Sequence, residues 1–265
     1  MEEWYRLGQN LRKFINPATF PVAVRFMEDE SLVPSSAKRP SKDLNEKMAP
    51  CQGAAMARRY GWTVAFSKED SGCAIADHTY GWKRADEESA ARFLTVMNYA
   101  SDDESARRVL SAFRTLNMGD NPAVVYSPLE RAKLEPDVIL IYVNPAQLMR
   151  LIHGATYKGG KPIESSFSGR AASCTEGVIT SYLTNSVRIV VPGNGDRVWA
   201  GCQDHEMIMA VPAGLLEEIV KGLEMTHQSG IRYPIPTYLK YTPEVAFSLP
   251  LSGIFDPEQQ KRLNK

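Results

Sequence analysis

The chain has 265 residues, 43% of them hydrophobic, which is enough to bury a sizeable core in one large domain or two closely packed halves. Its 31 basic and 31 acidic residues cancel, and no lysine- or arginine-rich run occurs, which argues against a nucleic-acid binder. No apolar run approaches the roughly 20 residues that span a bilayer, which argues against a membrane protein.

The N-terminal segment predicts an amphipathic helix rather than a signal peptide. Its apolar residues are spaced three or four apart, at Trp4, Leu7, Leu11 and Phe14. Asn16-Pro17 ends the pattern, and acidic residues occupy the place where a signal peptide carries basic ones. We therefore expect a cytoplasmic protein, and that compartment argues against two structural disulfides.

The next elements alternate between strand and helix. Residues 20–27 predict a first strand, and residues 29–45, rich in Ser, Pro, Asp and Lys, predict a surface loop. A helix is expected from about Pro50, with proline at its entry and a glycine at its end. The strand "WTVAF" at residues 62–66 then leads to a Ser-Gly turn before Cys73.

Residues 86–117 predict an outer helical hairpin, whose second helix opens with a capping box formed by Ser101 and Glu104. The continuous apolar run from Val138 to Val143 predicts a strand that is covered on both faces. "PAQLMRLIHG", at residues 145–154, predicts a helix with proline at its start and glycine at its end.

Two internal repeats can be read from the sequence. Residues 124–154 and 189–222 share the order strand, loop, strand, Pro-Ala-x-Leu, helix, glycine. A second repeat runs from Cys51 to Cys73 and again from Cys174 to Cys202. The two repeats conflict in register, so a duplication stays open.

The fold class expected from these patterns is α+β, with a mixed sheet, packed helices and an internal pseudo-two-fold organisation. We expect a single globular domain over residues 1–265, with structural halves at 18–155 and 163–228. The proline-rich tail, residues 229–265, predicts extended structure.

Several strings together resemble a known family. They are "FPVAVRF", "NPAQLMRL", "SGRAASC", "DHEMIMAVP" and "RYPIP", combined with the four spaced cysteines. From about residue 18 to about residue 245 the chain resembles the prokaryotic family domain of unknown function 169, also called ArCR. The resemblance implies that Cys51, Cys73, Cys174 and Cys202 match the family's cysteine pattern, and that the protein is prokaryotic and cytoplasmic. It implies no substrate, cofactor or catalytic residue.

The spacing of the cysteines favours an iron-sulfur cluster over a structural zinc site. No C-x-x-C occurs, and that motif is typical of zinc knuckles. A [4Fe-4S] cluster can be reached by thiolates from well-separated loops. Each cysteine also has a glycine within three residues, at Gly53, Gly72, Gly177 and Gly201, which lets the backbone approach a cluster closely.

Other uses of the four thiols stay open. Four cysteines in 265 residues is ordinary usage, and cysteine is often simply buried. A nucleophilic cysteine would need a histidine within reach and an oxyanion hole, and no local signature for either is present.

Two histidines follow an aspartate downstream of a cysteine, His78 after Asp77 and His205 after Asp204. They are candidate ligands or acid/base groups, although such pairs are more often satisfied polar residues.

Three further side chains are candidates for ligand binding. Arg170 lies between a glycine turn and Cys174, where it could hold a carboxylate or a phosphate. Asn144 and Gln147 follow a buried strand and could face a pocket, although Asn144 could simply cap the helix. "PGNGDR" at residues 192–197 lacks the lysine of a nucleotide-binding loop and is read as a turn.

The leading functional hypothesis is a [4Fe-4S] protein with all four cysteines as ligands, used in anaerobic-type redox chemistry, electron transfer or sensing. The alternatives are a cofactor-free binding protein for a small carboxylate or phosphate, and a cysteine-dependent hydrolase or transferase. The partners expected are a small molecule or a redox partner protein, with neither nucleic acid nor membrane. Self-association is left open.

Overall fold

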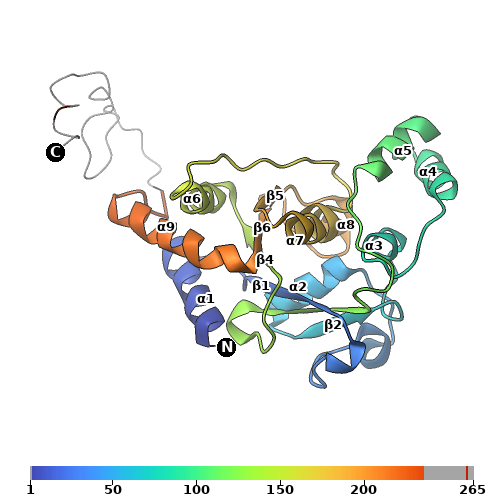
Figure 1. Cartoon of the computed structure of the whole chain (residues 1–265), viewed down its shortest axis with the longest axis horizontal. Helices are drawn as coiled ribbons and strands as arrows, with labels where there is room; N and C mark the ends of the chain where they lie inside the picture. Colours follow the sequence, from blue (N-terminus) through green and yellow to red (C-terminus); the bar gives the residue numbers. More distant parts are fainter. Residues whose placement is uncertain (1, 236–260, 262–265) are drawn as a thin grey trace.

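The structure is a computed structural model, and it describes residues 2–235 and Lys261. A six-stranded sheet forms its centre, in the order β2-β3-β1-β4-β6-β5, and all pairings between these strands are antiparallel. The strands are β1 (Val22–Met27), β2 (Val64–Ser67), β3 (Ala123–Pro128), β4 (Val138–Val143), β5 (Arg188–Val190) and β6 (Met207–Pro212). Helices cover both faces (Figure 1). The α+β class is confirmed, and its sheet is antiparallel where we expected a mixed one.

Apolar side chains alternate between the two faces of the sheet, as the two-residue period of a strand requires. Leu140 of β4 joins the core on one face, whereas its neighbours Ile139 and Ile141 join the core on the other. All six residues of β4 are buried, which confirms the strand covered on both faces that the apolar run predicts.

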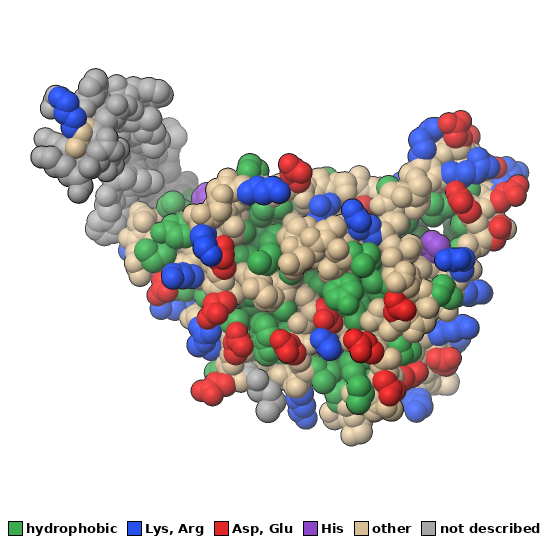
Figure 2. All heavy atoms as spheres, in the orientation of Figure 1, with side chains coloured by type: hydrophobic (Ala, Val, Ile, Leu, Met, Phe, Trp, Pro, Cys, Tyr) green, Lys and Arg blue, Asp and Glu red, His purple; other side chains and the backbone are tan. Residues whose placement is uncertain are grey.

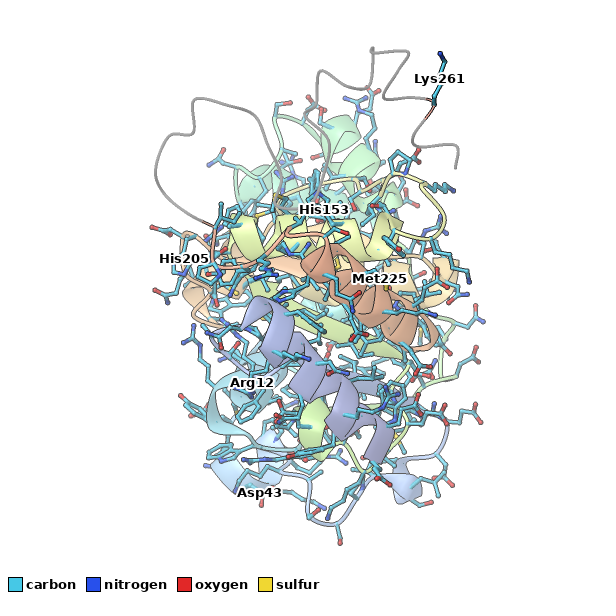
Figure 3. All side chains as sticks on the ribbon, turned by 90° about the vertical axis from the view of Figure 1, so that its left-hand side faces the viewer. Arg12, Asp43, His153, His205, Met225 and Lys261 are labelled. Atoms are coloured by element: carbon cyan, nitrogen blue, oxygen red, sulfur yellow. The ribbon has the colours of Figure 1, made fainter. Side chains whose placement is uncertain are left out.

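Three long helices form the layer on one face, which we call the back layer. They are α1 (Glu2–Ile15), α6 (Pro145–Thr156) and α9 (Leu216–Gln228). Figure 3 looks onto this layer, with α9 and α1 towards the viewer. The predicted stripe of α1 is buried at Leu7, Leu11 and Phe14, and the helix ends at Asn16, whose φ is 44°.

Two glycines set the closest approach within the back layer. Gly154 was expected to end α6, but the helix continues to Thr156 and Gly154 instead faces α9. A Cβ at Gly154 would lie 2.7 Å from the carbonyl oxygen of Ile219, and Gly222 of α9 meets the backbone of Gly154 in return. The small residue is therefore used for helix packing rather than for helix termination.

The opposite layer, which we call the front layer, is made of shorter helices. They are α2 (Pro50–Tyr60), α3 (Ala74–Thr79), the π-helix η4 (Ala172–Ile179), α7 (Thr180–Thr184) and α8 (Asn194–Val198). Tyr80, at the end of α3, joins the front layer to the sheet, because its hydroxyl group lies 2.7 Å from that of Tyr126 on β3. Within the sheet, Phe66 of β2 packs edge-on against Tyr126. All four cysteines lie on this side of the sheet.

The helical hairpin expected over residues 86–117 is present as α4 (Glu87–Val96) and α5 (Asp103–Ser111). It stands away from the sheet (Figure 1) and shows many charged side chains in the space-filling view (Figure 2). The cap of α5 differs from the expected box. Asp102 is the N-cap and accepts a hydrogen bond from the Ser105 amide, while the Ser101 hydroxyl donates to Asp102.

Four shorter helical turns complete the described part: η1 (Glu30–Leu32), the π-turn η2 (Pro40–Leu44), η3 (Leu129–Arg131) and η5 (Ala213–Leu215). The first two lie in the segment expected to be a surface loop, and Ala37 between them packs with Ala65 and Val125 of the sheet. Among the helices that the structure describes, none is long and apolar enough to cross a membrane.

Strands from both expected halves join one sheet, because β6 of residues 163–228 pairs with β4 of residues 18–155, and β5 pairs with β6 at the edge. Both units of the first repeat end with a strand followed by a back-layer helix, β4 with α6 and β6 with α9. The duplication itself stays a prediction. Most of the tail, residues 236–260 and 262–265, lies outside the described residues.

Replacing Gly154 with alanine should destabilise the protein by about 1–3 kcal/mol, because the added methyl group has no room against the backbone of α9. Gly159→Ala is the matched control, since nothing lies within 4 Å of a Cβ at that position. Urea denaturation of both variants measures the difference. Equal stabilities for the two would contradict the close packing of α6 and α9.

Candidate functional site

The front layer and α4 border a cavity of about 240 Å³, which we call the thiol cavity. Cys51, Cys73 and Cys174 all line it, although they lie far apart in the sequence. Its remaining walls come from α3, α4, residues 169–172 and α8. The fold therefore brings three of the four predicted cysteine ligands to one space.

Cys51 lies in the first turn of α2, directly after Pro50, where the missing amide of proline costs nothing. Its residue is only 8% exposed. Burial raises the pKa of the Cys51 thiol well above its ordinary value, and the negative charge of Asp196 raises it further. The thiol is therefore neutral at physiological pH unless a cation replaces its proton.

Cys73 occupies the N-cap position of α3. Burial raises the pKa of its thiol, while hydrogen bonds from the backbone amides of Ala76 and Ile75 act in the opposite direction. Gly72 just before it passes close to the main chain, and a Cβ there would lie 3.0 Å from the Lys47 carbonyl oxygen. This glycine thus lets the Cys73 segment approach the chain that leads into α2.

Cys174 lies in the π-helix η4. The residue before that helix, Ala171, has a φ of 38°, in the left-handed region that alanine seldom adopts. Burial raises the pKa of the Cys174 thiol, and the charges of Asp196 and Cys73 add to the effect. Single π-turns and strained residues often occur at functional sites, so the local geometry agrees with a role for this segment.

Asp196 fixes the position of the Cys174 segment. Its buried carboxylate accepts hydrogen bonds from the Ser173 amide at 3.2 Å, from the Gly193 amide at 3.0 Å and from the Ser173 hydroxyl. Its backbone carbonyl accepts the Cys202 amide at 2.9 Å. The sequence interpretation missed Asp196, because "PGNGDR" was tested only for nucleotide binding. Its last four residues, 194–197, belong to α8.

Cys202 lies beside a buried ion pair. The Arg58 guanidinium donates to Glu206 through Nη1–Oε1 at 2.6 Å and Nη2–Oε2 at 2.9 Å, and Arg58 Nη2 also lies 3.7 Å from Cys202 Sγ. Burial raises the pKa of the Cys202 thiol to about 12, although the charge of Arg58 opposes it. Cys202 is not among the residues that line the thiol cavity.

Of the other candidate residues, Arg170 lines the thiol cavity, whereas Asn144 and Gln147 lie at the start of α6 in the back layer. Those two side chains cap each other's backbone amides, and Gln147 Nε2 also donates to the carbonyls of Ile15 and Asn16. The structure therefore does not bring them together with Arg170.

The two candidate histidines do not line the thiol cavity either. Nδ1 of His78 accepts a hydrogen bond from the Ala85 amide at 3.3 Å. His205 is exposed at the edge of the molecule (Figure 3). The positions of both histidines agree with the interpretation that the Asp-His pairs are polar residues without a role in a site.

The thiols are free and do not form a compact single-metal site. All four cysteines are unpaired. Within residues 2–235, no three His, Cys, Asp or Glu side chains group closely enough to hold one metal ion. A cubane cluster needs a wider arrangement, with sulfurs about 6–7 Å apart by geometric estimate around four irons. Cys51, Cys73 and Cys174 border one cavity of about 240 Å³.

Comparison with known proteins places the chain in a family. The profile of domain of unknown function 169, described as uncharacterised ArCR, matches residues 10–222. The chain belongs to this family. The chain is similar to Uncharacterized protein MJ0308 of Methanocaldococcus jannaschii. The two are 24% identical over 209 residues, which cover 78% of this chain and 88% of that protein. No solved structure matches the chain significantly.

The family match includes all four cysteines and the whole thiol cavity, because residues 51–202 lie inside it. Both the family and the relative are described as uncharacterised.

Removal of the Glu206 charge should destabilise the protein by about 3–5 kcal/mol, because Glu206→Gln leaves the buried Arg58 charge without its partner. Glu217→Gln is the control: that carboxylate forms an exposed ion pair with Arg6, and its loss should cost less than about 1 kcal/mol. Urea denaturation at pH 7 measures both changes.

The cost of Glu206→Gln should also depend on pH. Burial acts to raise the pKa of Glu206, but hydrogen bonds from Arg58 and the Gln203 amide lower it below its ordinary value. The contribution of the ion pair is therefore complete above about pH 4.3 and is lost as the pH falls through the lowered pKa. A difference between wild type and variant that stays constant down to pH 2 would contradict this assignment.

Asp196→Asn should have two separate effects. It should destabilise the protein by about 1–3 kcal/mol, because an amide cannot accept all of the hydrogen bonds that the carboxylate accepts. It should also speed alkylation of Cys51 and Cys174, because it removes a negative charge that raises the pKa of both thiols. Peptide mass spectrometry after timed iodoacetamide treatment reads the second effect.

The control for Asp196→Asn is Asp204→Asn, an exposed aspartate 3.8 Å from Arg197. It should change neither the stability nor the reactivity of the thiols. In wild type, alkylation should rise about tenfold per pH unit between pH 7 and 9, since the thiolate fraction does so below a raised pKa. Fast, pH-independent alkylation would show that the thiols are already ionised.

Proposed function

We propose that the protein binds a [4Fe-4S] cluster in the thiol cavity, with Cys51, Cys73 and Cys174 as ligands, and that it uses the cluster for redox chemistry or sensing. The observation that carries the proposal is the convergence of these three thiols on one cavity. When bound, such a cluster would supply a one-electron centre or an iron that can hold a small molecule.

The surroundings of the thiols fit a cluster. The cavity is lined mainly by apolar side chains and main chain, and Cys51 is only 8% exposed. A low solvent exposure is one of the properties by which proteins tune the reduction potential of such clusters. Because the thiols carry raised pKa values, binding of the cluster would release protons and become stronger as the pH rises.

Cys202, the fourth cysteine predicted as a ligand, has a packing role rather than a ligand role in this proposal. Its sulfur contacts Arg58, and its amide is bonded to Asp196. We assign it to the packing between α2 and the start of β6, which leaves one iron of the cluster without a cysteine ligand and facing the cavity.

A nucleophilic cysteine is the weaker candidate. Such a thiol requires a lowered pKa and a general base beside it. All four thiols instead have raised pKa values, and neither candidate histidine lines the cavity that holds three of them.

Anaerobic reconstitution with iron and sulfide tests the proposal. Wild type should take up about four irons and four sulfides per chain and absorb near 400 nm, by analogy with cubane clusters in general. Cys51→Ser, Cys73→Ser and Cys174→Ser should each lose most of the bound iron. Cys202→Ser is the matched control, since it changes a buried cysteine on the same side of the sheet and should retain the cluster.

Circular dichroism before reconstitution separates a lost ligand from a lost fold. A wild type that remains colourless and free of iron would overturn the proposal. A Cys202→Ser variant that folds but loses iron as fully as the other three would contradict the three-thiol ligand set.

A further inference from the structure

We infer that the thiol cavity binds a small organic anion, with an apolar body against Phe93, Met97 and Trp199 and a carboxylate on Arg170. This inference goes beyond the cluster proposal, because it rests on the walls opposite the thiols and holds for the metal-free protein. If a cluster is present, the ligand would lie beside it.

The apolar wall of the thiol cavity contains large side chains that are exposed to solvent. Phe93 is 60% exposed, Met97 is 53% exposed and Trp199 is 55% exposed, yet all three line the same cavity. Phe93 and Met97 stand one turn apart on and just after α4, and Trp199 follows α8. Large apolar side chains gathered around a hollow are typical of a ligand site, because a bound apolar group removes them from water.

Arg170 supplies a cation whose hydrogen bonds are incomplete. Its Nη1 donates to the Ser168 carbonyl at 3.3 Å and its Nη2 donates to the Tyr99 carbonyl, while its buried Nε has no partner. Its guanidinium also lies 5.6 Å from the centre of the Tyr99 ring. Among the ion pairs of residues 2–235, none includes Arg170.

The second charged group of the cavity, Asp196, does not make a positively charged ligand more favourable than a negatively charged one. Asp196 also lines the cavity, but its carboxylate already accepts three hydrogen bonds from Ser173 and Gly193. A cationic ligand would therefore find at most one unused acceptor site on Asp196 and would also meet the positive charge of Arg170. An anion would instead give the guanidinium a charge-assisted partner, which a backbone carbonyl does not provide.

The cavity volume limits the size of the ligand. About 240 Å³ is less than the roughly 300–1,000 Å³ that is usual for drug-sized ligands. The ligand class is therefore a carboxylate with one ring or one short branched chain. Recognition would combine one charged contact with an apolar surface, the usual composition of a small-molecule site.

A fluorescence titration of the full chain tests the inference, because Trp199 lies in the wall and reports on its own surroundings. The probe is phenylacetate. Acetate and 2-phenylethanol are the matched probes, the first without the apolar body and the second without the charge. Phenylacetate should give a saturable change in emission, and both matched probes should bind at least about tenfold more weakly, since each lacks one of the two contacts.

Substitutions test the charged contact and the apolar contact separately. Arg170→Gln and the double variant Phe93→Ala with Met97→Ala should each raise the Kd for phenylacetate by about tenfold or more. Arg188→Gln is the control: this arginine donates to the Glu164 carbonyl and the Ser166 hydroxyl, outside the cavity, and should leave the Kd unchanged. Trp199→Phe should abolish the signal, with calorimetry used to detect binding in that variant.

The outcomes separate this inference from the cluster proposal. Binding by metal-free protein tests the anion site alone, whereas iron and sulfide content tests the cluster alone. A protein with no saturable response to phenylacetate, or one that binds 2-phenylethanol equally well, would overturn the inference. The second result would point to an apolar ligand or an apolar protein partner. Unchanged binding in a folded Arg170→Gln variant would overturn it as well.

Discussion

The front layer depends on one buried carboxylate. Asp196 binds the main chain and hydroxyl group of Ser173, the amide of Gly193 and, through its own carbonyl, the amide of Cys202. These bonds fix the π-helix that carries Cys174 against α8, and so they fix one wall of the thiol cavity. The same negative charge raises the pKa of Cys51 and Cys174. One side chain thus sets both the geometry and the protonation of the site.

The two sides of the thiol cavity have different chemistry. On one side, neutral thiols with raised pKa values are suited to exchange protons for a metal cluster rather than to attack a substrate. On the other side, Arg170 and exposed apolar side chains are suited to an organic anion. The proposed cluster and the inferred ligand would therefore meet in one space. That arrangement favours chemistry or sensing at a bound molecule over electron transfer alone.

The sequence patterns predicted those elements whose signal is local. The apolar period of α1 and the apolar run of β4 both follow from one segment, and the structure contains both. Gly154 was misread because a glycine near a helix end resembles a terminator, and only the packing of α9 shows its actual use. The N-cap of α5 is Asp102 rather than the expected Ser101, because neighbouring polar side chains compete for the same backbone amides.

The site could be predicted only in part, because it depends on which distant segments meet. The cysteines were recognised by residue type, but the sequence did not show that three of them line one cavity while Cys202 contacts Arg58, which lies 144 residues away in the sequence. Phe93, Met97 and Trp199 were missed because apolar residues in or beside helices usually indicate core. Asn144 was considered for a pocket, but its capping role with Gln147 uses both side chains.

The central claim is that three of the four thiols share one centre. Differential alkylation after anaerobic reconstitution tests it most directly, with the modification of each cysteine mapped by peptide mass spectrometry in the loaded and the metal-free protein. The account predicts that loading protects Cys51, Cys73 and Cys174 together and leaves the rate at Cys202 unchanged. Protection of all four thiols to the same extent, or of none, would contradict it.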